Sequence, residues 1–126
     1  MTQQQKEIRL IYVDDEPNAI TNCEYTVNAY GKVKSAEFFL NAFDALEFVK
    51  NNPIDIALLD VDMPKMNGFE LAKKLREIFP SLHIAFVTGN LNYLNPKNRE
   101  LDVPYLFKPY LDEEVFDVLD KVARCG

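Results

Sequence analysis

Five polar residues with chemically active side chains each stand at the end of an apolar run in this sequence. They are, in chain order, Asp14, Asp15, Asp60, Thr88 and Lys108. Short apolar runs rich in Val, Ile and Leu are typical of parallel strands that are buried on both faces. Ligand sites of open parallel sheets lie beyond the carboxyl ends of the strands, so we expect these five side chains to meet at one edge of a sheet.

The predicted cluster has the parts that phosphoryl transfer needs. Carboxylates brought together in a cleft repel one another, and a hard divalent cation such as Mg²⁺ removes that repulsion because it prefers oxygen ligands. An aspartate can then attack phosphorus and form an acyl phosphate. The transferring group develops charge on its outer oxygens, and the ammonium of Lys108 and the hydroxyl of Thr88 suit two of them.

The elements that position these residues follow from the same runs. We expect strands over Ile8–Val13, Lys34–Phe39, the segment ending at Asp60, His83–Thr88 and Val103–Phe107. Strands that alternate with helices through short connections imply parallel pairing and right-handed crossovers. The predicted fold class is therefore α/β, a three-layer α/β/α sandwich. For its five-stranded parallel sheet we expect the flavodoxin-like order 2-1-3-4-5, one of the common orders of doubly wound sheets.

Helical patterns lie between and after these strands. Pro17 suits the first turn of the first helix, Gly31 its end, and Asn41 the cap of the second. Asp112 is the expected cap of the last helix. The predicted buried stripes are Ile20, Cys23, Val27 and Tyr30; Ala42, Ala45, Leu46 and Val49; Leu71, Ala72, Leu75, Ile78 and Phe79; and Val115, Val118, Leu119, Val122 and Ala123.

Two segments do not follow the pattern. Residues 90–102 contain three asparagines and a proline but no amphipathic stripe, so we expect a short or irregular helix there. Phe43 and Phe48 lie off the buried stripe of the second helix and would form a contact patch if they are exposed.

Length and composition limit the possible fold and function classes. A chain of 126 residues is expected to form one domain over residues 1–126. The net charge of −6 argues against a nucleic-acid or anionic-membrane surface. Cys23 and Cys125 are too few for a disulfide framework, and we expect both to be reduced thiols in a cytoplasmic protein. Met1–Arg9 has no apolar signal core, and no stretch approaches the length of a membrane span.

Four motifs in this order resemble the receiver domain of two-component response regulators. They are Tyr-Val-Asp-Asp-Glu-Pro (12–17), Leu-Leu-Asp-Val-Asp-Met-Pro (58–64) with Asn67-Gly68, Val-Thr-Gly (87–89) and Phe-Lys-Pro (107–109). Each motif is weak alone, but together they are specific, and the resemblance covers roughly residues 8–122.

The resemblance implies a role for each site residue. Asp60 would be the phosphoacceptor, and Mg²⁺ would be bound by Asp15 directly, by Asp14 largely through water, by Asp60 and by the backbone carbonyl of Asp62. Thr88 and Lys108 would hold the phosphoryl oxygens. Tyr105 would be the aromatic switch residue that turns inward when Thr88 moves to the phosphate, and the Lys108–Pro109 peptide would be cis.

The resemblance also implies partners. A sensor histidine kinase or a histidine phosphotransfer protein would supply the phosphoryl group, and the downstream target is not encoded in the motifs. The irregular 90–102 segment departs from the family, in which a fourth helix contributes to the usual output face. Asp62 and Asn90 lie two residues after Asp60 and Thr88, at positions that flank the path of attacking water in this family, and the acid at 62 is expected to change the lifetime of the acyl phosphate.

Other interpretations of these residues are possible. Asp14, Asp15 and Glu16 could simply favour a helix dipole. The chain could be a degenerate receiver, a constitutive protein-binding module without phosphorylation, although Asp15, Asp60 and Lys108 are all present. A phosphatase with an aspartate nucleophile would use Asp62 as its second acid, but it also needs a second phosphate-binding motif and a cap, for which the chain has little room. His83 opens a strand and is expected to have no chemical role.

Overall fold

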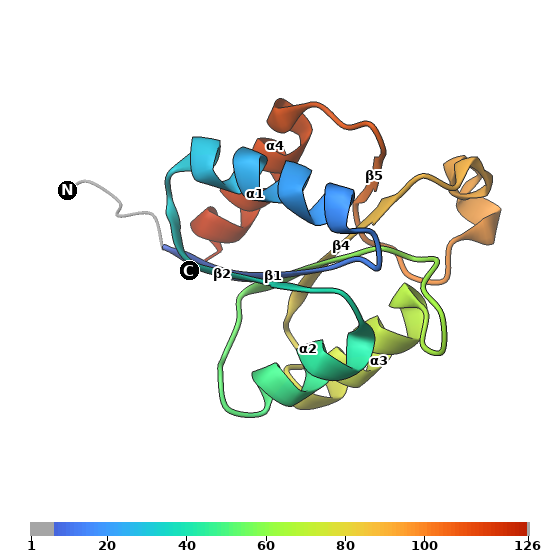
Figure 1. The fold of residues 1–126 in the computed structure, drawn as a ribbon, viewed down its shortest axis with the longest axis horizontal. Helices are drawn as coiled ribbons and strands as arrows, with labels where there is room; N and C mark the ends of the chain where they lie inside the picture. The colour runs from blue at the N-terminus through green and yellow to red at the C-terminus, as the bar shows by residue number, and fades with distance from the viewer. Residues whose placement is uncertain (1–6, 126) are drawn as a thin grey trace.

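The computed structural model describes residues 7–125, in which helices cover both faces of a central sheet. The described residues do not include most of Met1–Arg9, for which we predicted no signal core. They also do not include the last residue of the predicted domain. The helices α1 (Pro17–Tyr30) and α4 (Asp112–Arg124) lie on one face, and α2 (Ala42–Val49) and α3 (Gly68–Ile78) lie on the other (Figure 1). The predicted three-layer α/β/α sandwich is confirmed.

The sheet has five parallel strands in the order β2-β1-β3-β4-β5, as predicted. The strands are β1 (Ile8–Val13), β2 (Val33–Phe39), β3 (Ile56–Leu59), β4 (His83–Thr88) and β5 (Tyr105–Phe107). The bounds of β1 and β4 agree with the prediction. Three bounds were wrong: β2 begins one residue earlier, β3 ends before Asp60, and β5 begins two residues later, after Pro104.

Local sequence accounts for several helix ends. Gly31 has a φ of 76° and ends α1 in the left-handed region that glycine tolerates. The Asn41 side chain caps α2 by accepting from the Asp44 backbone N–H. Asn67 and Glu70 form a reciprocal capping box at the start of α3. The predicted cap at Asp112 was wrong, because Leu111 occupies the cap position and the Asp112 carboxylate accepts from the Thr26 hydroxyl instead.

Alternating side chains divide the core between the two faces of the sheet. Ile11 and Val13 pack with α2 and α3, whereas Leu10 and Tyr12 pack with α1 and α4. The stripe predicted for α4 is wholly buried. Ile78 was wrongly predicted to be buried: it is 41% exposed because α3 ends there, before Pro80. Four other residues of the predicted buried stripes are only half-buried: Ile20, Tyr30, Leu46 and Phe79.

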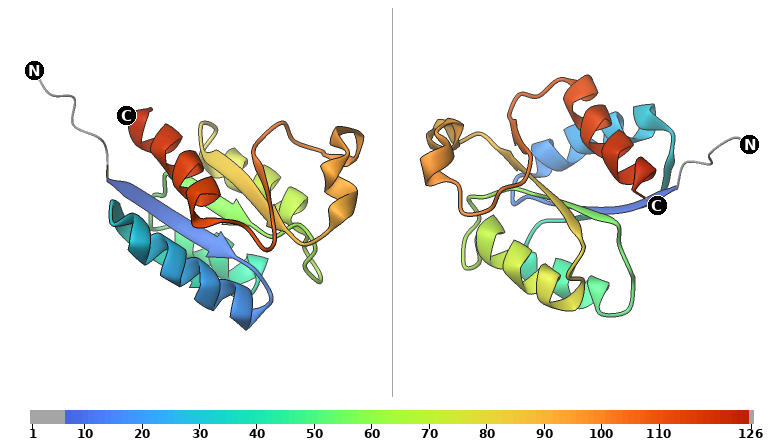
Figure 2. Two further views of the ribbon diagram at one scale, coloured as in Figure 1. Left: turned by 90° about the horizontal axis from the view of Figure 1, so that it is seen from above. Right: turned by 180° about the vertical axis from the view of Figure 1, so that it is seen from behind.

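The segment after β4 contains two short 3₁₀ helices, η1 (Leu91–Leu94) and η2 (Pro96–Asn98), in place of an α-helix. The side chains of Asn90 and Asn95 accept from the backbone two residues on, which satisfies each first turn locally. The segment lies outside both helix layers (Figure 2). The prediction of a short or irregular helix is confirmed. Of the predicted contact patch, Phe43 is exposed, whereas Phe48 is half-buried against Phe39.

Candidate functional site

The backbone places the candidate residues one step beyond the strands. The Asp60 N–H donates to Val13 O at 2.9 Å, and the Asp14 N–H donates to Phe39 O at 3.0 Å. The Lys108 N–H donates to Thr88 O at 2.9 Å in the same way. Each residue therefore continues the hydrogen bonding of the sheet while its side chain leaves the regular strand, which fixes its position more firmly than a loop would.

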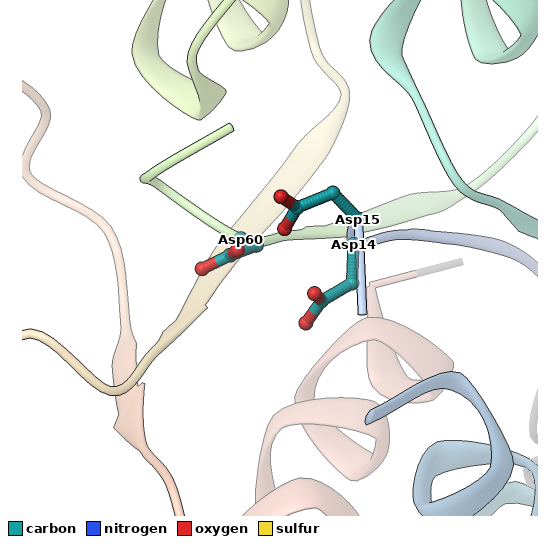
Figure 3. A group of neighbouring side chains, drawn as sticks. All are labelled: Asp14, Asp15 and Asp60. Carbon is teal, nitrogen blue, oxygen red and sulfur yellow. The ribbon is translucent and has the colours of Figure 1, made fainter. Parts of the chain in front are cut away.

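Three carboxylates meet at this edge, as the sequence predicts. Asp14, Asp15 and Asp60 each offer one oxygen, and these oxygens all lie within 4.8 Å of one another. All three side chains extend to the same side of the strand ends (Figure 3). Asp14 is fully buried and Asp60 is 6% exposed, whereas Asp15 is exposed to solvent. The cluster is thus anchored in the core and open on one side.

Lys108, which follows the carboxyl end of β5, joins the cluster. Its Nζ donates to Asp14 Oδ2 at 2.5 Å and lies 4.0 Å from Asp60 Oδ1. The peptide bond between Lys108 and Pro109 is cis, as expected. The ammonium is therefore bonded to Asp14 and close enough to Asp60 to act on a group bound there.

The surroundings of Asp60 disfavour its charge. Burial raises the pKa of Asp60 to about 7, with further increases from Asp14, Asp15 and Asp62 and an opposing decrease from Lys108. Without a cation, the carboxyl is therefore partly protonated near neutral pH. A positive ion beside it would restore the charged form that a nucleophile needs.

The donor set fits Mg²⁺. It consists of hard carboxylate oxygens, its negative charges are only partly balanced by Lys108, and its open side leaves room for the waters that Mg²⁺ retains. The Asp14, Asp15 and Asp60 carboxylates would hold the ion. The expectation that the Asp62 carbonyl also binds it stays a prediction.

Gly68 allows α3 to begin directly behind the candidate acceptor. A Cβ at this position would lie 2.2 Å from the backbone oxygen of Asp60, which is closer than any side chain permits. The Gly68 N–H donates to Val61 O at 2.8 Å and holds the turn closed. The sequence pattern includes Asn67-Gly68, and the close approach to Asp60 explains why glycine is needed there.

A second group of polar side chains lies on the loop side of Asp60. Thr88 is buried, and its Oγ1 accepts from the Asn90 N–H at 3.0 Å. The Asn90 side-chain amide donates to Asp62 Oδ2 at 3.0 Å and so joins the loop after β3 to the loop after β4. The two residues expected to flank the path of attacking water are thus bonded to each other.

Tyr105, the expected switch residue, lies on β5 next to β4 and is not among the clustered carboxylates. Its ring packs 5.1 Å from the ring of Phe86, and the Arg99 guanidinium lies 4.4 Å from its centroid. Its hydroxyl donates to Leu101 O at 3.2 Å. This half-buried tyrosine therefore connects the sheet to the 90–102 segment.

Tyr12 is a site residue that the sequence reasoning missed. Its hydroxyl donates to Asp14 Oδ2 at 2.8 Å, and both side chains are fully buried. The signal was available, because residues two apart on a strand share one face, which places Tyr12 on the same face as Asp14. It was hidden because Tyr12 falls within an apolar run and is equally suited to the core.

The motifs, the strand order and the cluster are together those of one family. A model of the response regulator receiver domain matches residues 10–120. The chain belongs to the response regulator receiver family. Receiver domains are signalling modules and not classical enzymes; they take phosphoryl groups from histidine kinases and bind Mg²⁺ at an acidic pocket.

A curated relative agrees with this assignment, and solved structures share the fold. The receiver is 26% identical over 117 residues to the sensory transduction protein LytT of Enterococcus faecalis, covering 93% of this chain and 48% of that protein. The response regulatory domain of MrkE from Klebsiella pneumoniae superposes with a TM-score of 0.80 at 24% identity, covering 94% of this chain and 97% of that one. Chemotaxis protein CheY4 of Vibrio cholerae gives a TM-score of 0.76 at 23% identity, covering 93% and 99%. The chain spans about half the length of the curated relatives it matches first.

No helix within residues 7–125 of this receiver is long and apolar enough to cross a membrane.

Proposed function

We propose that this receiver domain is a phosphorylation-activated switch that accepts a phosphoryl group on Asp60. The observation that carries the proposal is the position of Asp60, whose carboxylate lies within 4.8 Å of those of Asp14 and Asp15 and 4.0 Å from the ammonium of Lys108. The Asp60 carboxylate is slightly exposed, so a donor can reach it, while its neighbours are held by the sheet.

In the proposed reaction, one carboxylate oxygen of Asp60 attacks the phosphorus of a phosphohistidine. An O–P bond forms, the P–N bond breaks, and the electron pair of that bond stays on the leaving imidazole nitrogen. Asp60 becomes an acyl phosphate. The Lys108 ammonium, 4.0 Å from Asp60 Oδ1, would turn from Asp14 to bind an outer phosphoryl oxygen, and Thr88 would donate its hydroxyl to another.

Mg²⁺ is the proposed cofactor, held by the carboxylates of Asp14, Asp15 and Asp60 and by the backbone carbonyl of Asp62. When bound, it supplies positive charge that offsets the charge of the carboxylates and of the transferring group. The protein's own contribution is geometric, since the strand ends hold the carboxylates close together before any donor arrives.

The proposed switch runs from Thr88 to Tyr105. Thr88 Oγ1 now accepts from the Asn90 N–H, and a phosphoryl group on Asp60 would draw the Thr88 hydroxyl toward it. Space vacated by Thr88 would then admit the Tyr105 ring, which packs on Phe86 of the neighbouring strand. Phosphorylation would thereby shift the equilibrium between two conformations.

The proposed donor is a sensor histidine kinase or a histidine phosphotransfer protein in the cytoplasm. A groove of about 500 Å³ lies between α1 and the segment that follows β5, and Lys108 is among the residues that line it. We propose that the donor contacts this groove, since Lys108 in its lining lies 4.0 Å from Asp60 Oδ1. The net charge of −6 does not favour direct binding of nucleic acid.

Intact mass after incubation with Mg²⁺ and acetyl phosphate tests the proposal. The expected result is a gain of one phosphoryl group that needs Mg²⁺, that is absent in Asp60→Asn and that persists in Asp117→Asn, which alters an exposed acid on α4. Because rapid hydrolysis would hide the adduct, binding of beryllofluoride is measured in parallel.

The rival function is a degenerate receiver that binds a partner constitutively. Absence of the mass gain together with absence of Mg²⁺ and beryllofluoride binding would favour that rival over phosphorylation.

A further inference from the structure

The hydroxyl of Tyr12 occupies an unusual place in the core of this receiver. Tyr12 lies in the central strand β1, paired with Phe38 of β2 and Leu58 of β3. Both flanking residues are apolar, and Tyr12 itself is fully buried. A buried hydroxyl needs a partner, and this one donates to Asp14 Oδ2 at 2.8 Å.

Asp14 has few alternative partners. Its Oδ1 accepts from the Glu16 N–H at 3.0 Å, and its Oδ2 accepts from both Tyr12 and Lys108. Because Asp14 is fully buried, a lost hydrogen bond at Oδ2 is not readily replaced by solvent. Within residues 7–125, Tyr12 and Lys108 are therefore the two side chains that donate to this buried oxygen.

The proposed phosphorylation makes opposing demands on Lys108. Its Nζ is bonded to Asp14 at 2.5 Å and is 4.0 Å from Asp60, so it must turn toward Asp60 to hold a phosphoryl oxygen. That movement weakens its bond to Asp14. Tyr12 cannot follow it, since its ring is fully buried in the core that the sheet forms with α1 and α4, and its hydroxyl stays on Oδ2.

We propose that Tyr12 is a positioning residue whose hydroxyl keeps Asp14 Oδ2 hydrogen-bonded, so that Lys108 is free to turn from Asp14 to a phosphoryl group on Asp60. The inference rests on the proposed function. It assigns to a core tyrosine a role that acts through Asp14 and Lys108 and requires no contact with the phosphoryl group.

The test compares Tyr12→Phe with Tyr30→Phe. Each variant removes one hydroxyl that donates to an aspartate, but Tyr30 bonds Asp120 at 2.7 Å between α1 and α4, away from the site. At saturating Mg²⁺, we expect Tyr12→Phe to slow phosphorylation by acetyl phosphate and to weaken beryllofluoride binding, each by about tenfold. Tyr30→Phe is expected to change both by less than about twofold.

A double-mutant comparison separates positioning from simple packing. In Lys108→Ala there is no ammonium to release, so adding Tyr12→Phe should change the residual phosphorylation rate by less than about twofold. A second comparison is made in EDTA, without a phosphodonor. There, Lys108→Ala should lower the thermal unfolding midpoint more in the Tyr12→Phe protein than in the wild type, because Oδ2 then loses both partners.

Three results would overturn the inference: rates for Tyr12→Phe equal to those of Tyr30→Phe, additive effects in both comparisons, or loss of the wild-type Tyr12 hydroxyl proton signal on binding beryllofluoride. The last measurement needs no variant, so it decides the matter even if Tyr12→Phe does not fold. Failure of the proposed function is separate, since the wild type itself would then neither gain a phosphoryl group nor bind beryllofluoride.

Discussion

Hydrogen-bonded polar side chains lie on two sides of Asp60, but their surroundings differ. On the buried side, formed by Tyr12, Asp14 and Lys108, the hydrogen bonds are 2.5 and 2.8 Å long and meet at a carboxylate with no exposed surface. On the loop side, formed by Asp62 and Asn90, a single bond of 3.0 Å joins two loops, and Asp62 is exposed.

This difference separates two properties of a receiver. Charges on the buried side act on Asp60 through little solvent, so in the proposed reaction they would govern whether the carboxylate accepts a phosphoryl group. Groups on the loop side are screened by water and contribute little to the charge balance, but they stand where solvent enters. We therefore expect the buried side to determine acceptance and the loop side to determine lifetime.

The largest predicted effect is on the free energy of unfolding and comes from the buried carboxyl of Asp60. Its pKa rises from 3.8 to about 7 on folding, so the native state keeps a proton between these values that the unfolded state has lost. Stability therefore falls as the pH rises from about 4 to about 7. In the absence of a divalent cation, Asp60→Asn should raise the free energy of unfolding at about pH 8 by up to about 4 kcal/mol, and this gain should vanish near pH 4.

Urea unfolding at several pH values in EDTA measures this gain. The matched control is Asp62→Asn on the exposed loop side, which should change the unfolding free energy by less than about 0.5 kcal/mol. A pH-independent gain for Asp60→Asn would show that a cause other than the buried charge stabilises the variant.

The next prediction concerns a variant that lacks the ammonium of Lys108 on the buried side. Lys108→Ala should slow phosphorylation of Asp60 by acetyl phosphate about a hundredfold, since one group that stabilises the developing phosphoryl charge is lost. The control is Lys73→Ala, whose ammonium pairs with Glu100 at 3.1 Å on the exposed surface and which should leave the rate unchanged. Equal rates for the two variants would mean that the position of Lys108 has no part in acceptance.

Much of this arrangement is predictable from the sequence, because buried parallel strands leave a clear signal. Apolar runs predicted β1 and β4 to the residue, and the acids that follow β1 and β3 meet as expected. Strand ends converge by topology alone, so the order of the strands suffices to bring together side chains from distant motifs.

Other features depend on contacts between residues that are far apart in the sequence, and a linear pattern does not reveal these contacts. Asp112 suits a helix cap, yet its carboxylate bonds Thr26 on α1, a partner far away in sequence. Ile78 fits the helical spacing of a buried stripe but lies at the last residue of α3, beyond the covered part of the helix. In the sequence, the aromatic ring of Tyr12 makes it fit an apolar run. Only the structure shows that its hydroxyl donates to Asp14.

The smallest predicted effect belongs to the loop side and is confined to lifetime. The bond between Asn90 and Asp62 joins the two loops that border Asp60, so breaking it should admit water and shorten the half-life of the phosphorylated form about twofold to threefold. Asn90→Ala, Asp62→Ala and the double variant should have similar half-lives, because each removes the same bond. The initial rate of phosphorylation should not change. Decay of the isolated phosphorylated protein, followed by intact mass, measures this, and single-variant effects that multiply in the double variant would show that the two residues act independently.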